Sequence, residues 1–202
     1  MGKNIVISVG CEYASGGVEI GKIIADDLEI EYFDRELIDK IITRVGISQN
    51  LVDLADAGAY VKGRTSAENN AGGPTKYMNL TDRLVFVQKQ IVKKLADRGP
   101  CVIIGRCADY ILKERKEVLN VFVYAPLEDR IKRTMEYVGC GREEAIKLIE
   151  ENDAMYHARY QQITGTFRGD RHNRHLMIDS SLLGIEGTAK YIEKLVSMVK
   201  EA

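Results

Sequence analysis

Residues Asn4 to Lys22 read NIVISVGCEYASGGVEIGK. The first six residues are a nearly continuous apolar run, which predicts a strand buried on both faces. A glycine-rich turn over residues 10–17 follows, and apolar residues at 20, 23, 24 and 28 then predict an amphipathic helix. Such a turn presents backbone N–H groups and a helix N-terminus to an anion. We therefore predict a phosphate-binding loop made of Ala14, Ser15, Gly16, Gly17 and Val18.

This loop departs from the Walker A motif, which reads GxxxxGK followed by Ser or Thr. If Gly16 is the second glycine of the motif, Cys11 stands in the place of the first. Gly17 then replaces the lysine and Val18 replaces the hydroxyl residue. The GxGxxG pattern is also missing, which disfavours an NAD-dependent dehydrogenase that would use Asp34 for a ribose. Taken alone, the stretch is also compatible with a glycine-rich connection that binds nothing.

The rest of the chain continues the alternation of strand and helix. Further short apolar runs predict strands at 31–33, 101–104, 119–124 and 175–179. Helical patterns cover 35–45, 48–57, 79–98, 107–114, a segment opened by Pro126, 141–162 and 184–200. This order predicts an α/β fold of three layers, with a five-stranded parallel sheet covered by helices on both faces. The ligand is expected beyond the carboxyl ends of the strands, where Gly10, Asp34, Arg106, Tyr124 and Asp179 fall.

Composition and length favour a single domain over residues 1–202 of a cytoplasmic protein. Lys and Arg number 29 against 30 Asp and Glu, and a net charge of −1 disfavours bulk attraction to nucleic acid or an anionic membrane. No apolar run approaches the ~20 residues of a membrane span, and the N-terminus does not resemble a signal peptide. Residues 58–77 lack an apolar period and are predicted to be a mobile loop. The four cysteines lack CxxC spacing, so we expect reduced thiols and no metal site.

Four stretches, taken in order, resemble the cytidylate kinase-like family of the P-loop nucleoside monophosphate kinases. The first is SVGCEYASGGVEIGKIIADDLEIEYFDRELID, which starts at Ser8. The others are CVIIGRCADYIL at 101–112, VFVYAPLEDRIKR at 121–133, and DAMYHARYQQITG with HLMIDSSLLGIEG between 153 and 187. The resemblance implies transfer of the ATP γ-phosphate to CMP, dCMP or a related small molecule, with ATP and Mg²⁺ as cofactors. The implied partner is a small-molecule nucleotide, whereas the oligomeric state is not indicated.

The resemblance also implies roles for particular residues. Arg106, Arg130 and Arg159 are predicted to be catalytic, and Asp34, Arg83 and Asp109 to bind the acceptor. Residues 35–80 would form an acceptor-side flap, and residues 152–174, which begin close to Asp153, a lid. Ordinary structural roles stay open: Asp34 as a helix cap, Arg106 paired with Asp109, Arg130 paired with Asp129 or Glu136, and Arg83 on a solvated face. The basic stretch that holds Arg168, Arg171 and Arg174 is either a solvated loop or part of the lid.

Several positions depart from the family pattern, and they keep a second function open. Cys11 and Val18 stand where the family carries arginine, and Ala14 stands where it carries glycine. True cytidylate kinases have Asp at the position of Ile104 and arginines at those of Asn152 and Met155. Positioned cations of this kind can be worth roughly 10³-fold or more in phosphoryl-transfer rate. The alternative to a kinase is therefore a nucleotide-binding sensor or interaction protein of the same fold that has lost phosphotransfer.

Overall fold

A computed structural model describes residues 5–57 and 80–201 of the chain. The predicted mobile loop at 58–77 lies outside these residues. The five strands are β1 (Val6–Cys11), β2 (Glu31–Phe33), β3 (Cys101–Ile104), β4 (Val118–Tyr124) and β5 (Leu176–Asp179). They form one parallel sheet in the order β2-β3-β1-β4-β5. The predicted five-stranded parallel sheet is thus confirmed.

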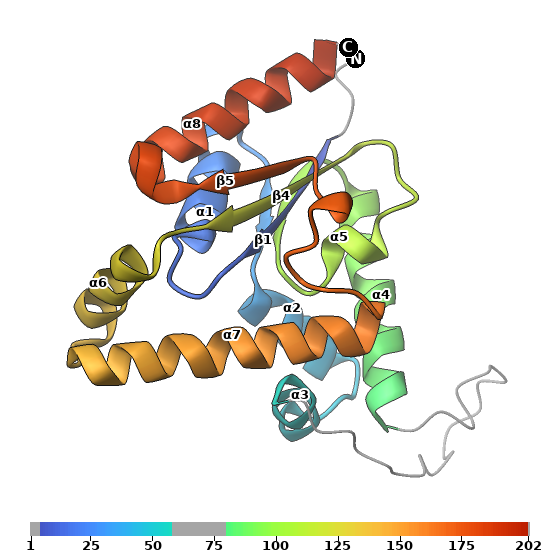
Figure 1. The fold of residues 1–202 in the computed structure, drawn as a ribbon. Helices are drawn as coiled ribbons and strands as arrows, with labels where there is room; N and C mark the ends of the chain where they lie inside the picture. The colour runs from blue at the N-terminus through green and yellow to red at the C-terminus, as the bar shows by residue number, and fades with distance from the viewer. Residues whose placement is uncertain (1–4, 58–79, 202) are drawn as a thin grey trace, which may run out of the picture.

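Side chains of the central strands alternate between two cores, as the two-residue period of a strand requires. In β3, Cys101 and Ile103 pack with one core, whereas Val102 and Ile104 pack with the other. The first core is closed by α2 (Arg35–Arg44), α3 (Gln49–Asp56), α4 (Leu80–Arg98) and α5 (Ala108–Ile111). The second is closed by α1 (Gly17–Asp27) and α8 (Ser180–Glu201). Figure 1 shows α1 and α8 on one side of the sheet and α4 and α5 on the other, which confirms the three layers.

Two further helices border the carboxyl edge of the sheet. They are α6 (Leu127–Val138) and α7 (Arg142–Thr164), which pack on each other through Ile131, Ala145 and Ile149. The long α7 passes below that edge in Figure 1 and reaches α3. After it the chain makes a short 3₁₀ turn, η2 (Arg171–Asn173), and enters β5. Helix α7 therefore brings residues of the predicted lid next to the phosphate loop and the sheet edge.

Local signals explain most helix boundaries, with three differences. Ser48 caps α3, as predicted, by accepting a hydrogen bond from the backbone N–H of Leu51. Pro126 lies at the cap of α6 rather than inside its first turn. Helix α5 is only four residues long, which is shorter than the predicted 107–114. Helix α8 starts at Ser180, four residues early, because a short helical turn is joined to the main helix across a kink at Gly184 (φ 68°, ψ −179°).

Candidate active site

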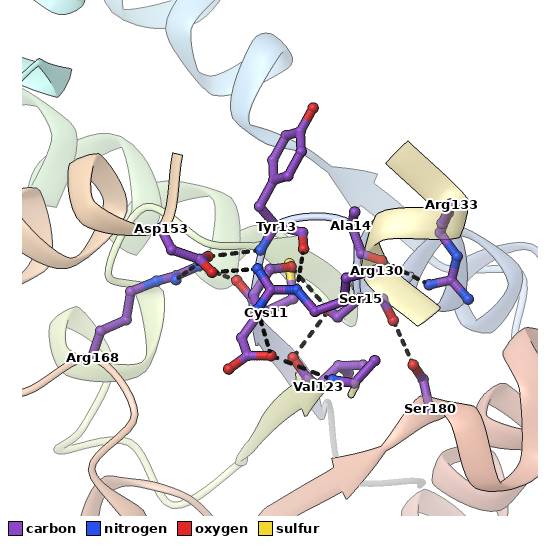
Figure 2. A network of polar contacts seen from close by, with 12 residues as sticks. Cys11, Tyr13, Ala14, Ser15, Val123, Arg130, Arg133, Asp153, Arg168 and Ser180 are labelled. Atoms are coloured by element: carbon purple, nitrogen blue, oxygen red, sulfur yellow. Dashed lines mark hydrogen bonds and ion pairs between the residues drawn. The ribbon is translucent and has the colours of Figure 1, made fainter. Parts of the chain in front are cut away.

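Side chains from other elements, together with Ser15 of the loop itself, bind the backbone carbonyl groups of the loop between β1 and α1 (Figure 2). Five consecutive carbonyl oxygens, those of residues 11–15, accept hydrogen bonds from side chains. The donors are Arg168 to Cys11, Ser15 Oγ to Glu12 (2.9 Å), Arg130 Nε to Tyr13 (2.7 Å), Arg133 to Ala14 (3.1 Å) and Ser180 Oγ to Ser15 (2.6 Å). The loop is therefore anchored on its carbonyl side, three times by a guanidinium group.

The N–H groups of Glu12, Tyr13 and Ser15 already donate to Val123, Asp153 and Glu12, so the part of the loop left to a ligand is the start of α1. Gly16 has a left-handed conformation (φ 83°) and stands at the N-cap of α1 without a side-chain capping bond. The first N–H groups of a helix have no partner within the helix, and the helix dipole places partial positive charge there. A phosphate is the natural ligand of such a terminus. The conformation thus agrees with the predicted phosphate-binding role of residues 14–18, which stays a prediction.

Arg130 and Asp153 connect the loop to α6 and α7. The Arg130 guanidinium is 8% exposed and forms ion pairs with Asp153 and, at 3.3 Å, with Glu12. The other Asp153 oxygen accepts the backbone N–H of Tyr13 at 2.9 Å, and Arg168 lies 3.8 Å from it. Arg130 therefore pairs with carboxylates distant in sequence rather than with Asp129 or Glu136. Its predicted catalytic role remains untested.

A cleft of about 150 Å³ opens next to the loop at the carboxyl edge of the sheet. Four of the predicted site residues line it: Arg106, Asp109 and Arg159, with Val18 of the predicted phosphate-binding loop. Its wall also includes Cys11, Arg35, Asp56, Gln88, Tyr156, Tyr160, Arg168 and Arg174. The cleft thus gathers arginines and carboxylates from segments that range in sequence from Arg35 to Arg174, at the place where an α/β sheet binds its ligand.

Arg106 is held by two buried carboxylates. Its two terminal nitrogens lie 2.8 and 3.1 Å from the oxygens of Asp56, and the second nitrogen also donates to Asp39. Burial, reinforced by the charge of Asp56, raises the pKa of Asp39 although Arg106 opposes the shift. Gln88 donates to the Arg106 carbonyl oxygen at 2.8 Å and supports the left-handed backbone there (φ 51°). The alternative partner considered for Arg106, Asp109, is not used.

Arg159 has more unpaired donors than Arg106, in which only Nε is buried without a hydrogen-bond partner among the described residues. Arg159 is 6% exposed, donates to Gln162 at 3.1 Å and places Nε 3.5 Å from an Asp56 oxygen. Its Nε and Nη2 atoms are buried without a hydrogen-bond partner in the described part of the chain. Burial lowers the pKa of Arg159, and Asp56 only partly compensates. An anion that entered the cleft would supply the missing acceptors.

Asp109 and Arg174 form a second ion pair in the wall of the cleft. Asp109 is 8% exposed and accepts hydrogen bonds from Tyr160 (2.6 Å) and Arg174. Burial and the Asp109 charge raise the pKa of Tyr160. Burial also raises the pKa of the neighbouring Cys107 to about 12, so this thiol is not ionised near neutral pH. The arrangement suits binding and charge neutralisation rather than nucleophilic catalysis by cysteine.

Two predicted acceptor residues lie outside the cleft lining. Asp34 follows β2 and caps α2, where it accepts the N–H of Leu37 at 2.8 Å, so the capping alternative is the observed contact. Arg83 is half-buried on α4. Neither lines the cleft. No contact tests their predicted roles in acceptor binding, which remain predictions.

The sequence reasoning missed Asp39, Asp56 and Gln88. Two of these carried a signal. Asp56 is the last residue of α3, where a negative charge opposes the helix dipole. Gln88 interrupts the buried stripe of α4 that includes Leu84, Ile91 and Leu95, and a polar residue in such a stripe needs a partner. Asp39 forms a charge pair with Arg35 at i,i+4 spacing. Such a pair is typical of a solvated helix face, so the sequence did not indicate that Asp39 contacts Arg106.

Two further properties of the described residues concern metal binding and membrane-spanning helices. Within residues 5–57 and 80–201, no group of three or more His, Cys, Asp and Glu side chains is placed to hold a metal ion. In the same residues, no helix combines the length and apolar character needed to cross a membrane.

Comparison with known proteins agrees with the fold. A model of the cytidylate kinase-like family matches residues 6–182. A cytidylate kinase of Methanocaldococcus jannaschii is 24% identical over 199 residues, covering 98% of this chain and 100% of that protein. A solved protein of Eubacterium ventriosum superposes with a TM-score of 0.73 at 19% identity, covering 96% of this chain and 98% of the other. Shikimate kinase of Bacteroides thetaiotaomicron superposes with a TM-score of 0.55 at 12% identity, covering 96% of this chain and 98% of the other, so the two chains share their fold. With a match that spans most of its length, the chain belongs to the cytidylate kinase-like family.

Proposed function

We propose that this protein is a kinase that transfers the γ-phosphate of ATP to a nucleoside monophosphate, CMP or dCMP among them, or to a related small anionic molecule. One observation carries the proposal: the anchored, glycine-rich loop between β1 and α1 lies beside a cleft in which a buried arginine, Arg159, has unpaired donors. The loop would hold the donor phosphates and the cleft the acceptor anion. Membership of the family supports the same assignment.

The loop fits a triphosphate through its backbone and through nearby cations. Arg133 and Arg168 both donate to loop carbonyls, which places their positive charge next to the helix N-terminus. Mg²⁺ fits less well, because Val18 has no hydroxyl and the Ser15 hydroxyl already contacts two carbonyl oxygens. Mg²⁺ commonly keeps several waters and binds through substrate phosphates, so ATP itself would bring most of its ligands. No step of the proposed chemistry is assigned to loop ligands of the metal.

Catalysis in this cleft would consist of positioning and charge neutralisation. Arg159 would bind the acceptor anion, since an anion supplies the acceptors that its guanidinium lacks. Arg106 is already paired with two carboxylates and would orient the cleft rather than carry free charge to the reacting atoms. A net charge of −1 agrees with a small-molecule partner rather than nucleic acid, and a cytoplasmic location is part of the proposal.

A sensor or interaction protein that binds nucleotide without transfer is the second candidate. Gly17 and Val18 support it, because the loop lacks both the phosphate-contacting lysine and the metal-binding hydroxyl. The carboxylate partners of Arg106, Arg130 and Arg174 support it as well, since they offset the positive charge that phosphoryl transfer uses.

A coupled ADP-release assay against CMP, dCMP, UMP, AMP and GMP, each with ATP and Mg²⁺, separates the two candidates. A kinase releases ADP only when its acceptor is present, and Arg159→Ala should lower that rate roughly 10²-fold or more. Arg142→Ala is the matched control, because Arg142 is more than half exposed and pairs with Glu128 far from the cleft. Binding of ATP in calorimetry without ADP release with any acceptor would favour the sensor.

A further inference from the structure

Position 17 of the phosphate loop has no room for a side chain. A Cβ atom placed on Gly17 would lie 2.3 Å from Cys11 Cβ, 3.0 Å from Cys11 Sγ and 3.4 Å from Val123 Cβ. Non-bonded carbon atoms prefer separations of about 3.5–4.0 Å. Backbone conformation does not explain the glycine, because Gly17 is the first residue of α1 and its φ is outside the left-handed region. Space alone requires glycine here.

Cys11 cannot move aside to make that room. Rotation about its side-chain bond moves Sγ but leaves Cβ in place. Its backbone is the last residue of β1, paired in register with Val123, and its carbonyl oxygen accepts a hydrogen bond from Arg168. The following loop is anchored at every carbonyl from Glu12 to Ser15. The overlap can therefore be relieved only by displacing backbone that several other elements hold.

We propose that Cys11 and Gly17 form a coupled pair in which Cys11 fixes the loop in a form without lysine. In the Walker A motif the two positions have the opposite assignment, with glycine at the first and lysine at the second. The Cβ of Cys11 occupies the volume that the lysine stem would take. The two departures from the motif are thus one packing arrangement, and a lysine can enter at 17 only after position 11 loses its Cβ. The prediction about ATP affinity rests on the proposed function, whereas the packing of Cys11 against Gly17 does not.

Thermal unfolding of the original chain and five variants tests the packing. Gly17→Ala should lower Tm by roughly 5 °C or more, because overpacking displaces anchored backbone. The same Gly17→Ala change made in Cys11→Gly should lower Tm far less than it does in the original chain. Cys11→Ala is the matched control: it keeps Cβ and removes only Sγ, so Cys11→Ala/Gly17→Ala should not recover relative to Cys11→Ala. Tm losses from Gly17→Ala that are equal in all three backgrounds, or no loss in the original chain, would overturn the proposal.

Calorimetry with ATP tests what the pair does to the ligand. Cys11→Gly/Gly17→Lys should bind ATP at least 10-fold more tightly than Cys11→Gly, since the lysine adds a charge at the phosphates. Gly17→Lys in the original chain should not gain affinity and should unfold at a lower temperature. A gain in affinity from Gly17→Lys that is as large with Cys11 present as without it would contradict the coupling.

The two hypotheses fail differently. Coupled Tm values with no ATP binding by any folded variant would support the packing pair and refute the proposed function. ATP binding and ADP release by the original chain, with uncoupled Tm values, would support the proposed function and refute the pair.

Discussion

Replacement of Arg106 tests whether the charge cluster under the cleft is organised as the structure indicates. In Arg106→Met, Asp39 loses the guanidinium that donates to it, and Asp56 keeps Arg35 at 2.7 Å and Arg159 at 3.5 Å, while the two carboxylate side chains are only 11% and 7% exposed. Removal of one partner from a buried ion pair costs about 3–5 kcal/mol. For a chain of this length each kcal/mol shifts Tm by about 2–4 °C, so the expected loss in Tm is about 6–20 °C.

The loss in Tm that Arg106→Met causes should depend on pH. Burial already raises the pKa of Asp39 in the native protein, and loss of Arg106 removes a group that lowers it. A carboxyl whose folded pKa lies above its unfolded value destabilises the fold when ionised, so stability is regained as pH falls. The Tm difference between Arg106→Met and the original chain should therefore shrink from pH 7.5 to pH 5. A further Asp56→Asn change should recover part of the loss at pH 7.5.

Arg106→Lys separates structure from catalysis. Lysine keeps the charge but cannot bind Asp56 with two parallel hydrogen bonds. If Arg106 contacts the transferred or acceptor phosphate, this variant should stay folded and lose roughly 10²-fold or more in ADP release. If Arg106 only organises the carboxylates, Tm should fall while the rate of the folded protein is retained. An Arg106→Met variant as stable as the original chain, with no pH dependence of the difference, would refute the cluster.

Three further predictions concern single residues. Arg159→Met should keep or raise Tm, because replacing a buried guanidinium with unpaired donors by an apolar side chain removes a desolvation cost; a loss above about 2 kcal/mol in urea unfolding would show that its contact with Asp56 dominates. Burial and the neighbouring Asp27 raise the pKa of Glu193, so Glu193→Gln should have a higher Tm than the original chain at pH 7. This gain in Tm should vanish near pH 4, where Glu193 is protonated. Equal Tm differences at both pH values would argue against the pairing of Glu193 with Asp27. Asp34→Ala should cost about 0.5–2 kcal/mol in urea unfolding through loss of the α2 cap, and Asp34→Asn should restore most of it; ADP release lost equally in both variants would instead indicate acceptor binding.

The sheet was predictable because buried parallel strands carry local signals. Each strand is a short apolar run, and the alternation of such runs with helical patterns predicts a parallel sheet covered by helices. All five predicted strands are present, with ends within two residues of those observed. The strand order and the kink at Gly184 were not anticipated, because they depend on how crossovers pack rather than on any local pattern.

The sequence by itself determined the fold class, the position of the glycine-rich turn between β1 and α1, and the edge of the sheet at which the cleft lies. Strand-to-helix turns and strand ends are local features, so Gly16 and Arg106 could be singled out without knowing their neighbours, whereas Arg159 was singled out by the family resemblance. Charge partners are a different kind of information. Arg106 binds Asp39 and Asp56, which lie 67 and 50 residues earlier, and no spacing rule connects them.

Only the tertiary structure decided which arginines are free and why the loop lacks a lysine. Arg159 and Arg130 look alike in sequence, yet the first has unpaired donors and the second is enclosed by carboxylates. The absence of lysine at position 17 follows from the 2.3 Å approach of its Cβ position to that of Cys11. Such facts depend on distances between atoms on different elements, which the packing of β1 against α1, α6 and α7 sets.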